Sequence, residues 1–148
     1  MKFGFIGTNW ITDKLIECGR QTATFEPYAV YSRTEERANY FKDKHDLKEI
    51  FTDLNQFCES SNFDAVYIAS PNAFHFEQAK LAIENNKHVL IEKPATINVE
   101  QFEALSKLAH EYNVTVMEAM KSTVLKPFLQ FAKANADIGE IRYADFHY

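Results

Sequence analysis

Glycine is scarce in this 148-residue chain, with four residues, and cysteine is scarcer still, with two. Cys18 and Cys58 have no CxxC spacing, so we expect neither a metal site nor a disulfide. No run of 18 apolar residues occurs, and no signal-like apolar region follows Met1, which favours a soluble cytoplasmic protein. Basic runs are also absent. Sixteen basic and 21 acidic residues give a net charge of −5, so neither nucleic acid nor a membrane is an expected partner.

What the chain does have is a regular alternation of strand-like and helix-like segments. Apolar residues make up 46% of the sequence, enough for one domain with a real core. The apolar runs predict strands over 2–6, 28–31, 49–51, 65–69, 88–91 and 114–117. Segments with helical periodicity separate them, and Thr34 and Asp53 are placed as N-caps. This alternation predicts an α/β fold, a doubly wound parallel sheet of the Rossmann type with right-handed crossovers.

The turn after the first strand reads Gly7-Thr8-Asn9-Trp10-Ile11-Thr12 and opens the first helix. A dinucleotide fingerprint needs this context, because N–H groups at a helix N-terminus hold a pyrophosphate. Asn9 and Thr12 stand where GxGxxG has its second and third glycines. Asparagine tolerates positive φ better than most residues, so we expect Asn9 to take the glycine-like conformation. Alone the motif is weak, because any strand-to-helix turn can carry one glycine.

The end of the second strand bears on the kind of dinucleotide. NAD-preferring domains place an acidic residue there for the ribose 2′-OH, whereas this chain has Ser32-Arg33, with Arg37 one helical turn later. A hydroxyl and two guanidinium groups would accept a 2′-phosphate, which favours NADP(H) over NAD(H) and argues against a methyltransferase. The alternative is that both arginines lie on a solvated helix face, paired with Glu35 and Glu36.

Two further strand ends carry polar residues. Ala69-Ser70-Pro71-Asn72 and His75 follow the fourth strand, where Asn72 is placed to cap the next helix; the plainer interpretation is a strand-exit turn with a surface His75. Glu92-Lys93-Pro94 follows the buried run 89–91. A carboxylate and an ammonium are tolerated at the carboxyl lip of a parallel sheet, where such folds form their ligand crevice. Pro94 restricts the backbone of Lys93, making it a candidate functional cation, and we hypothesise a cis Lys93–Pro94 bond.

In their order and spacing, these motifs resemble the N-terminal domain of the Gfo/Idh/MocA oxidoreductases over essentially all 148 residues. The branch that contains dihydrodiol dehydrogenase and glucose–fructose oxidoreductase is the most similar. The matching motifs are Gly4-Phe5-Ile6-Gly7-Thr8, Ser32-Arg33, Ser70-Pro71-Asn72 with His75, Lys87-His88-Val89, Glu92-Lys93-Pro94 and Met117-Glu118-Ala119-Met120 followed by Pro127.

The resemblance implies roles for these residues around an NADP(H) or NAD(H) cofactor. Lys93 would hydrogen-bond both the cofactor and the reacting hydroxyl or carbonyl, and Glu92 would lie near the nicotinamide ribose. The other expected contacts are Gly7, Thr8, Asn9, Trp10 and Ile11 at the pyrophosphate, Ser32, Arg33 and Arg37 at the 2′-phosphate, and Ala69, Ser70, Pro71, Asn72, His75 and Pro94 along the cleft.

Towards its end the chain departs from a simple Rossmann domain. A last helix is expected after Pro127, and residues 140–148 read as a strand that stops at a bare edge. We therefore expect a dinucleotide-binding domain at 1–120 and, at 121–148, a linking helix and the first strand of a second α/β domain that is otherwise missing. In the family, that second domain supplies substrate contacts, the usual homo-oligomer interface and the general acid/base.

The expected function is hydride transfer between nicotinamide and a sugar, polyol or dihydrodiol. Lys93 would polarise the reacting oxygen. The 148-residue chain alone is expected to bind nucleotide without efficient turnover. Two alternatives stay open at this point: a non-catalytic nucleotide sensor or regulatory module on the same fold, and a structural or assembly domain. Because the substrate would be recognised beyond Tyr148, the sequence does not identify it.

Overall fold

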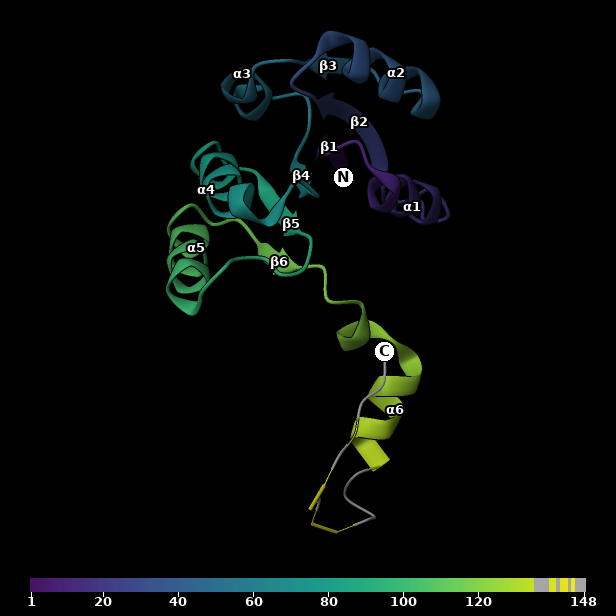
Figure 1. The fold of residues 1–148 in the computed structure, drawn as a ribbon, viewed down its shortest axis with the longest axis vertical. Coiled ribbons are helices and arrows are strands. Elements are labelled where there is room, and N and C mark those ends of the chain that lie inside the picture. The colour runs from purple at the N-terminus through teal and green to yellow at the C-terminus, as the bar shows by residue number, and fades with distance from the viewer. Residues whose placement is uncertain (135–138, 141, 144, 146–148) are drawn as a thin grey trace.

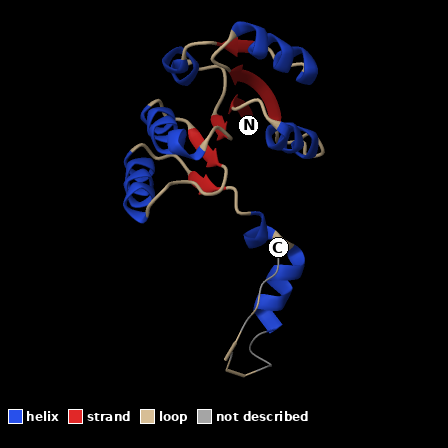
Figure 2. Ribbon diagram, in the orientation of Figure 1, coloured by secondary structure: helices blue, strands red, loops and turns tan. Residues whose placement is uncertain are grey.

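Six parallel strands form one sheet in the computed structural model, which describes residues 1–134, 139, 140, 142, 143 and 145 (Figures 1 and 2). Their order across the sheet is β3-β2-β1-β4-β5-β6, and every neighbouring pair is parallel. The strands are β1 (Lys2–Ile6), β2 (Glu26–Tyr31), β3 (Glu49–Phe51), β4 (Ala65–Ile68), β5 (His88–Ile91) and β6 (Val116–Glu118).

Helices cover both faces of this sheet, as the predicted doubly wound α/β fold requires. They are α1 (Trp10–Gly19), α2 (Glu35–His45), α3 (Leu54–Glu59), α4 (His75–Glu84) and α5 (Val99–Glu111), with the 3₁₀ turn η1 (Asn72–Phe74) before α4. A further 3₁₀ turn, η2 (Lys121–Val124), and the helix α6 (Lys126–Ala134) follow the sheet and lie away from it. Asp53 caps α3 as predicted, its side chain accepting a hydrogen bond from the N–H of Gln56. Thr34 is the N-cap of α2, but its side chain makes no capping bond.

The core has two parts because side chains alternate across each strand. On one face, Ile6 and Ile68 pack with apolar side chains of α3, α4 and α5. On the other face, Phe5 and Tyr67 pack with side chains of α1 and α2. Figure 1 shows the same division, with α1 and α2 on one side of the strands and α4 and α5 on the other. Gly4 in β1 makes room for this packing, since a Cβ there would lie 2.6 Å from the ring of Phe57.

Predicted and observed elements agree closely in the first 118 residues. The structure reproduces the predicted bounds of β1, β3 and β5; β2 starts two residues earlier, and β6 runs over 116–118 rather than 114–117. Asn72 does not cap α4: it begins η1, and Phe74 is the N-cap residue of α4. The helix predicted after Pro127 is α6, whereas the strand predicted over 140–148 falls largely outside the described residues.

Candidate functional site

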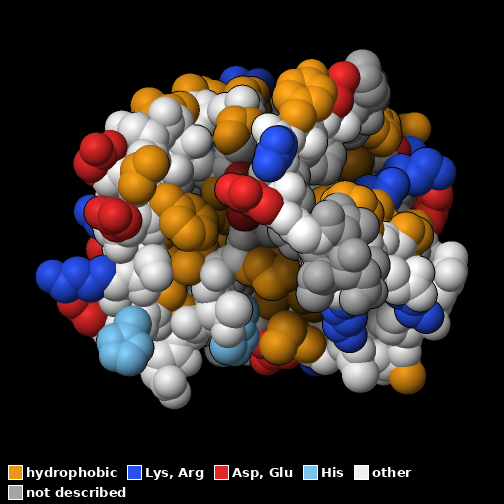
Figure 3. Space-filling model, turned by 90° about the horizontal axis from the view of Figure 1, so that it is seen from below, with side chains coloured by type: hydrophobic (Ala, Val, Ile, Leu, Met, Phe, Trp, Pro, Cys, Tyr) orange, Lys and Arg blue, Asp and Glu red, His pale blue; other side chains and the backbone are white. Residues whose placement is uncertain are grey.

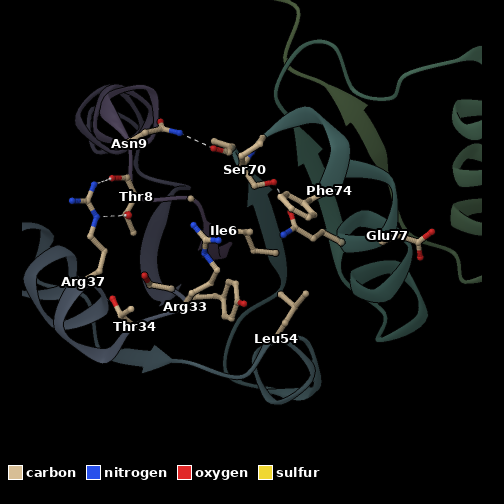
Figure 4. A pocket seen from close by; sticks show the side chains of 16 residues that line it. Ile6, Thr8, Asn9, Arg33, Thr34, Arg37, Leu54, Ser70, Phe74 and Glu77 are labelled. Atoms are coloured by element: carbon tan, nitrogen blue, oxygen red, sulfur yellow. Dashed lines mark hydrogen bonds between the residues drawn. The ribbon is translucent and has the colours of Figure 1, made fainter.

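The strand order reverses between β1 and β4, and the loops leaving these two strands border the main cavity. Open parallel sheets bind ligands at such a switch point, outside the carboxyl ends of the strands. The cavity measures about 730 Å³. It is lined by Ile6, Gly7, Thr8, Asn9, Tyr31, Ser32, Arg33, Thr34, Arg37, Leu54, Ala69, Ser70, Pro71, Phe74, Glu77 and Gln78 (Figure 4).

Gly7 gives the turn after β1 its shape. Its φ is +107°, a conformation that side chains disfavour, and a Cβ at this position would lie 2.5 Å from the carbonyl oxygen of Ala69. The backbones of the loops after β1 and β4 therefore approach each other more closely than any residue but glycine allows. This is the close approach that a phosphate-binding turn requires.

Asn9 does not take the glycine-like conformation predicted for it. Its φ is −108° and its ψ is 177°, which is extended backbone, and it is the N-cap of α1. Its Oδ1 accepts from the N–H groups of Ile11 and Thr12, and its Nδ2 donates to the Ala69 carbonyl at 2.6 Å. The prediction was wrong because the side chain of Asn9 caps α1, and its capping hydrogen bonds need the extended backbone of an ordinary N-cap residue.

Thr12, at the position of the third glycine, is completely buried. Its hydroxyl donates to the carbonyl oxygen of Gly7 at 2.8 Å, which ties the first turn of α1 to the glycine. The phosphate turn is thus held by side-chain hydrogen bonds where the glycine-rich form relies on close backbone packing. Thr12 and Asn9 are compatible with the turn rather than defects in it.

The two arginines after β2 differ in what they contact (Figure 4). Arg37 donates through Nε to Thr8 Oγ1 at 2.9 Å and through Nη2 to the Thr8 carbonyl at 2.7 Å. The guanidinium of Arg33 extends towards the middle of the cavity, and no partner for it occurs among the described residues. In that same part of the chain, neither arginine pairs with Glu35 or Glu36, which removes the alternative of a salt-bridged helix face.

His75 is fully buried, so it is not the surface residue of the plainer interpretation, and it does not line the cavity either. Its Nε2 lies 2.8 Å from the Ser70 carbonyl and its Nδ1 lies 3.0 Å from the Pro94 carbonyl. Both partners are acceptors: a neutral imidazole donates one of these bonds, and the imidazolium donates both. His75 connects the loop after β4 to the loop after β5.

Glu92-Lys93-Pro94 forms the loop after β5, and the Lys93–Pro94 bond is cis, as hypothesised. Tyr67, buried in β4, donates its hydroxyl to Glu92 Oε1 at 2.7 Å. Burial raises the pKa of Tyr67, and the hydrogen bond to Glu92 raises it further, so the phenol remains a proton donor. The ammonium of Lys93 is exposed and has no hydrogen-bonding or ionic partner within the described ranges.

Glu118, the last residue of β6, completes the support of this loop. Its Oε1 accepts from the N–H of Ala95 at 2.8 Å. Tyr67, His75 and Glu118 therefore reach the same loop from three different elements. Sequence analysis did not single out Tyr67, since one tyrosine in a buried strand gives no functional signal. The sequence analysis named Glu118 only within the motif Met117-Glu118-Ala119-Met120.

Nine of the predicted site residues line the cavity, and seven do not. The lining ones are Gly7, Thr8, Asn9, Ser32, Arg33, Arg37, Ala69, Ser70 and Pro71; the others are Trp10, Ile11, Asn72, His75, Glu92, Lys93 and Pro94. Trp10 is 71% exposed at the first position of α1, next to the turn. Sequence analysis missed the wall of the cavity that η1 and α4 form with Phe74, Glu77 and Gln78. Gln78 accepts a hydrogen bond from the Ser70 hydroxyl there at 2.6 Å.

The described residues contain no group of three or more His, Cys, Asp or Glu side chains arranged to hold a metal ion. Among the helices of the same residues, none has the length and apolar character needed to cross a membrane.

Comparison with known proteins agrees with this geometry. Residues 1–120 match a family described as "Oxidoreductase family, NAD-binding Rossmann fold". The scyllo-inositol 2-dehydrogenase (NADP(+)) IolU of Bacillus subtilis (strain 168) is 46% identical over 142 residues, covering 96% of this chain and 43% of that protein. D-xylose 1-dehydrogenase (NADP(+)) 2 of Haloferax volcanii is 32% identical over 119 residues, covering 80% of this chain and 37% of that protein.

A solved structure of an NADP complex has a similar fold over most of this chain. KijD10, a 3-ketoreductase from Actinomadura kijaniata in complex with NADP and TDP-benzene, superposes with a TM-score of 0.86 at 28% identity, covering 93% of this chain and 42% of that one. The chain spans less than half the length of each of these relatives.

Proposed function

The chain belongs to the Gfo/Idh/MocA oxidoreductase family, and from this we propose that it is the NADP(H)-binding part of a dehydrogenase or reductase acting on a sugar, polyol or related alcohol. The substrate class follows the relatives, whose names specify inositol and xylose oxidation with NADP(+). NAD(H) is the second cofactor that the same cavity would take.

One observation carries the cofactor proposal: the Gly7 turn and the unpartnered guanidinium of Arg33 face one cavity. At the start of α1, the N–H groups of Ile11 and Thr12 are bonded by Asn9 Oδ1, and the N–H of Trp10, which has no partner among the described residues, is left for a pyrophosphate. Ser32 and Arg33 at the end of β2 offer a hydroxyl and a cation where an NAD-preferring domain offers a carboxylate. These residues fit a dinucleotide that carries a 2′-phosphate.

The chemistry of hydride exchange with a carbinol carbon is supplied by the nicotinamide when it is bound. The chain contributes Lys93, whose free ammonium stands at the lip of β5 and would hydrogen-bond the reacting oxygen and stabilise its developing charge. Glu92, fixed by Tyr67, would contact the nicotinamide ribose. His75 is buried and would contact neither the cofactor nor the substrate. It would position Glu92 and Lys93 through its hydrogen bonds to the loops after β4 and β5.

Nucleotide binding is tested directly with Trp10, the single tryptophan, which lies beside the turn. Titration with NADPH is expected to change its fluorescence in a saturable manner, with NADH binding about tenfold or more weakly because it lacks the contacts to the 2′-phosphate. Equal affinities would refute the cofactor preference. Absence of binding by either nucleotide would refute the proposal as a whole.

The proposal includes a domain arrangement. Residues 1–120 form the dinucleotide-binding domain, and residues 121–148 start a second domain that carries substrate contacts, the general acid/base and an interface between subunits. The family match ending at residue 120 and the greater length of the relatives support it. The 148-residue chain is then expected to bind NADPH without efficient turnover, and rapid steady-state oxidation of an inositol or pentose by this chain alone would contradict it.

Lys93→Met in a protein of the relatives' length separates an enzyme from a nucleotide sensor on the same fold. An enzyme loses about 100-fold or more in kcat, because a transition-state hydrogen bond is lost, while its affinity for NADPH stays within about twofold. A sensor has no turnover to lose. The exposed lysine Lys107 of α5, changed to Met, is the matched control.

A further inference from the structure

Arg37 and Arg33 are one helical turn apart in sequence, yet Arg37 is already bound within the protein. It reaches from α2 to the turn after β1, 29 residues earlier in the chain, and makes two hydrogen bonds to the same residue. One goes to the side chain of Thr8 and the other to its carbonyl. Two donors of a rigid guanidinium on one residue fix that residue's backbone as well as its rotamer.

Thr8 directly follows Gly7, whose backbone conformation creates the phosphate turn. The other side of this turn is fixed by Asn9 bonding to the Ala69 carbonyl and by Thr12 bonding to the Gly7 carbonyl. Arg37 supplies the contact from the β2–α2 side. The turn is thus held from the loop after β4, from α1 and from α2, and only the last of these contacts involves a charged group.

Arg33 makes no hydrogen bond to the turn after β1. It comes directly after Ser32, its side chain extends into the cavity, and its guanidinium has no partner among the residues that the structure describes (Figure 4). All five of its N–H donors are available to a ligand.

We propose that the two arginines divide the work of cofactor recognition: Arg37 is a positioning residue that holds the pyrophosphate turn through Thr8, and Arg33 alone determines the preference for a 2′-phosphate. The inference rests on the proposed function, and it replaces the sequence-based expectation that both arginines bind the 2′-phosphate. A pyrophosphate is common to NADPH and NADH, so Arg37 serves both cofactors equally.

The test is to measure Kd for NADPH and for NADH by Trp10 fluorescence in the 148-residue chain. Arg33→Ala is expected to weaken NADPH binding about 10- to 100-fold and to leave NADH within about twofold, because a charge-assisted hydrogen bond to phosphate is lost. Arg37→Ala is expected to weaken the binding of both cofactors by the same factor, about 3- to 30-fold. The ratio of the Kd for NADPH to the Kd for NADH then stays at the wild-type value. Lys48→Ala removes a surface cation elsewhere and controls for net charge.

A double-mutant cycle distinguishes positioning from general weakening. Thr8→Val removes the hydroxyl that accepts from Arg37 Nε, and it is expected to weaken both cofactors in the wild-type background but to have little further effect with Arg37→Ala. A selective loss of NADPH binding in Arg37→Ala, or strictly additive effects of the two changes, would overturn the division of work. If the wild-type chain binds neither nucleotide, the proposed function itself fails.

Discussion

At the scale of single residues, Gly7 has the strictest requirement in the site. Gly7→Ala introduces both an unfavourable φ of +107° and a Cβ 2.5 Å from the Ala69 carbonyl. We expect it to lower the free energy of unfolding by about 2–4 kcal/mol and to abolish NADPH binding, because the two loops must separate. Urea denaturation and Trp10 fluorescence measure the two effects.

Gly139→Ala is the matched control for that change. Gly139 also has a positive φ, +76°, but a Cβ there meets nothing within 4 Å. Because Gly139 lies beyond residue 120, outside the core, we expect Gly139→Ala to leave the free energy of unfolding within about 0.5 kcal/mol. Equal destabilisation by the two substitutions would mean that the contact with Ala69 plays no part.

Tyr67 makes the next prediction at this scale. Tyr67→Phe removes only the hydroxyl that donates to Glu92, and we expect a loss of about 1 kcal/mol in the free energy of unfolding in urea. Tyr40→Phe, which alters a residue that is 60% exposed, should stay within about 0.5 kcal/mol. A Tyr67→Phe protein as stable as the Tyr40→Phe protein would show that Glu92 does not depend on this bond.

Residue identity was easier to predict than residue contact. Lys93 and Gly7 could be located because each stands at a strand end, a position that the local pattern defines. The roles of His75 and Arg37 depend on contacts with Pro94 and Thr8, 19 and 29 residues away. No local pattern contains that information, so the sequence indicated His75 and Arg37 as site residues without indicating that they are bonded to Pro94 and Thr8.

At the scale of elements, α1 and α2 are joined by a small charged cluster on the face opposite α4 and α5. Asp13 of α1 accepts from Lys44 Nζ at 2.8 Å and contacts His45 Nε2 at 2.7 Å. The Arg20 guanidinium, next to α1, donates to the carbonyl of His45. This cluster fixes the helix that carries Arg37 relative to the helix that opens at the phosphate turn.

The cluster predicts a pH dependence of stability. Burial raises the pKa of Asp13, but the hydrogen bonds from Lys44 and His45 outweigh burial and bring it below the ordinary 3.8. A carboxyl with a lowered folded-state pKa stabilises the fold above its unfolded pKa and loses that contribution as the pH falls through the folded value. The stability difference between wild type and Asp13→Asn should therefore be largest above pH 4 and shrink below it, as measured by urea denaturation. A pH-independent difference would contradict this account.

Most elements could be predicted because their signal is local. Buried parallel strands read as short apolar runs, and five of the six have at least one end where the sequence places it. The conformation of Asn9 could not be predicted, since helix capping and a glycine-like turn both favour asparagine. The capping bonds to Ile11 and Thr12 and the hydrogen bond to the Ala69 carbonyl are made from the extended N-cap backbone.

At the scale of the whole molecule, residues 121–134, which form η2 and α6, lie apart from the sheet. In Figure 1, α6 stands away from the strands, and η2 is the element with which it makes most contact. Exposed apolar side chains are concentrated here: Val124, Leu125, Phe128, Leu129 and Phe131. Figure 3, viewed from the end where α6 lies in Figure 1, shows several hydrophobic side chains on that surface.

A chain of residues 1–120 should therefore keep the fold and the nucleotide site. We expect its urea midpoint to stay near that of the 148-residue chain and its Kd for NADPH to change by less than about twofold, because the core lies within the sheet and α1–α5. Removing the exposed apolar side chains should also reduce self-association in gel filtration. Loss of NADPH binding in the shorter chain would contradict the assignment of residues 1–120 as a self-sufficient domain.

The central position of β1 has a consequence for how the chain folds. β1 is synthesised before both of its partners: it pairs on one side with β2, about 24 residues later in the chain, and on the other with β4, about 62 residues later. The half-sheet β3-β2-β1 can form early, but its free edge at β1 is an apolar template until β4 is available. During synthesis on the ribosome, that edge stays open for some seconds at ordinary elongation rates. We expect a chaperone that shields apolar strands to act on this protein in that interval.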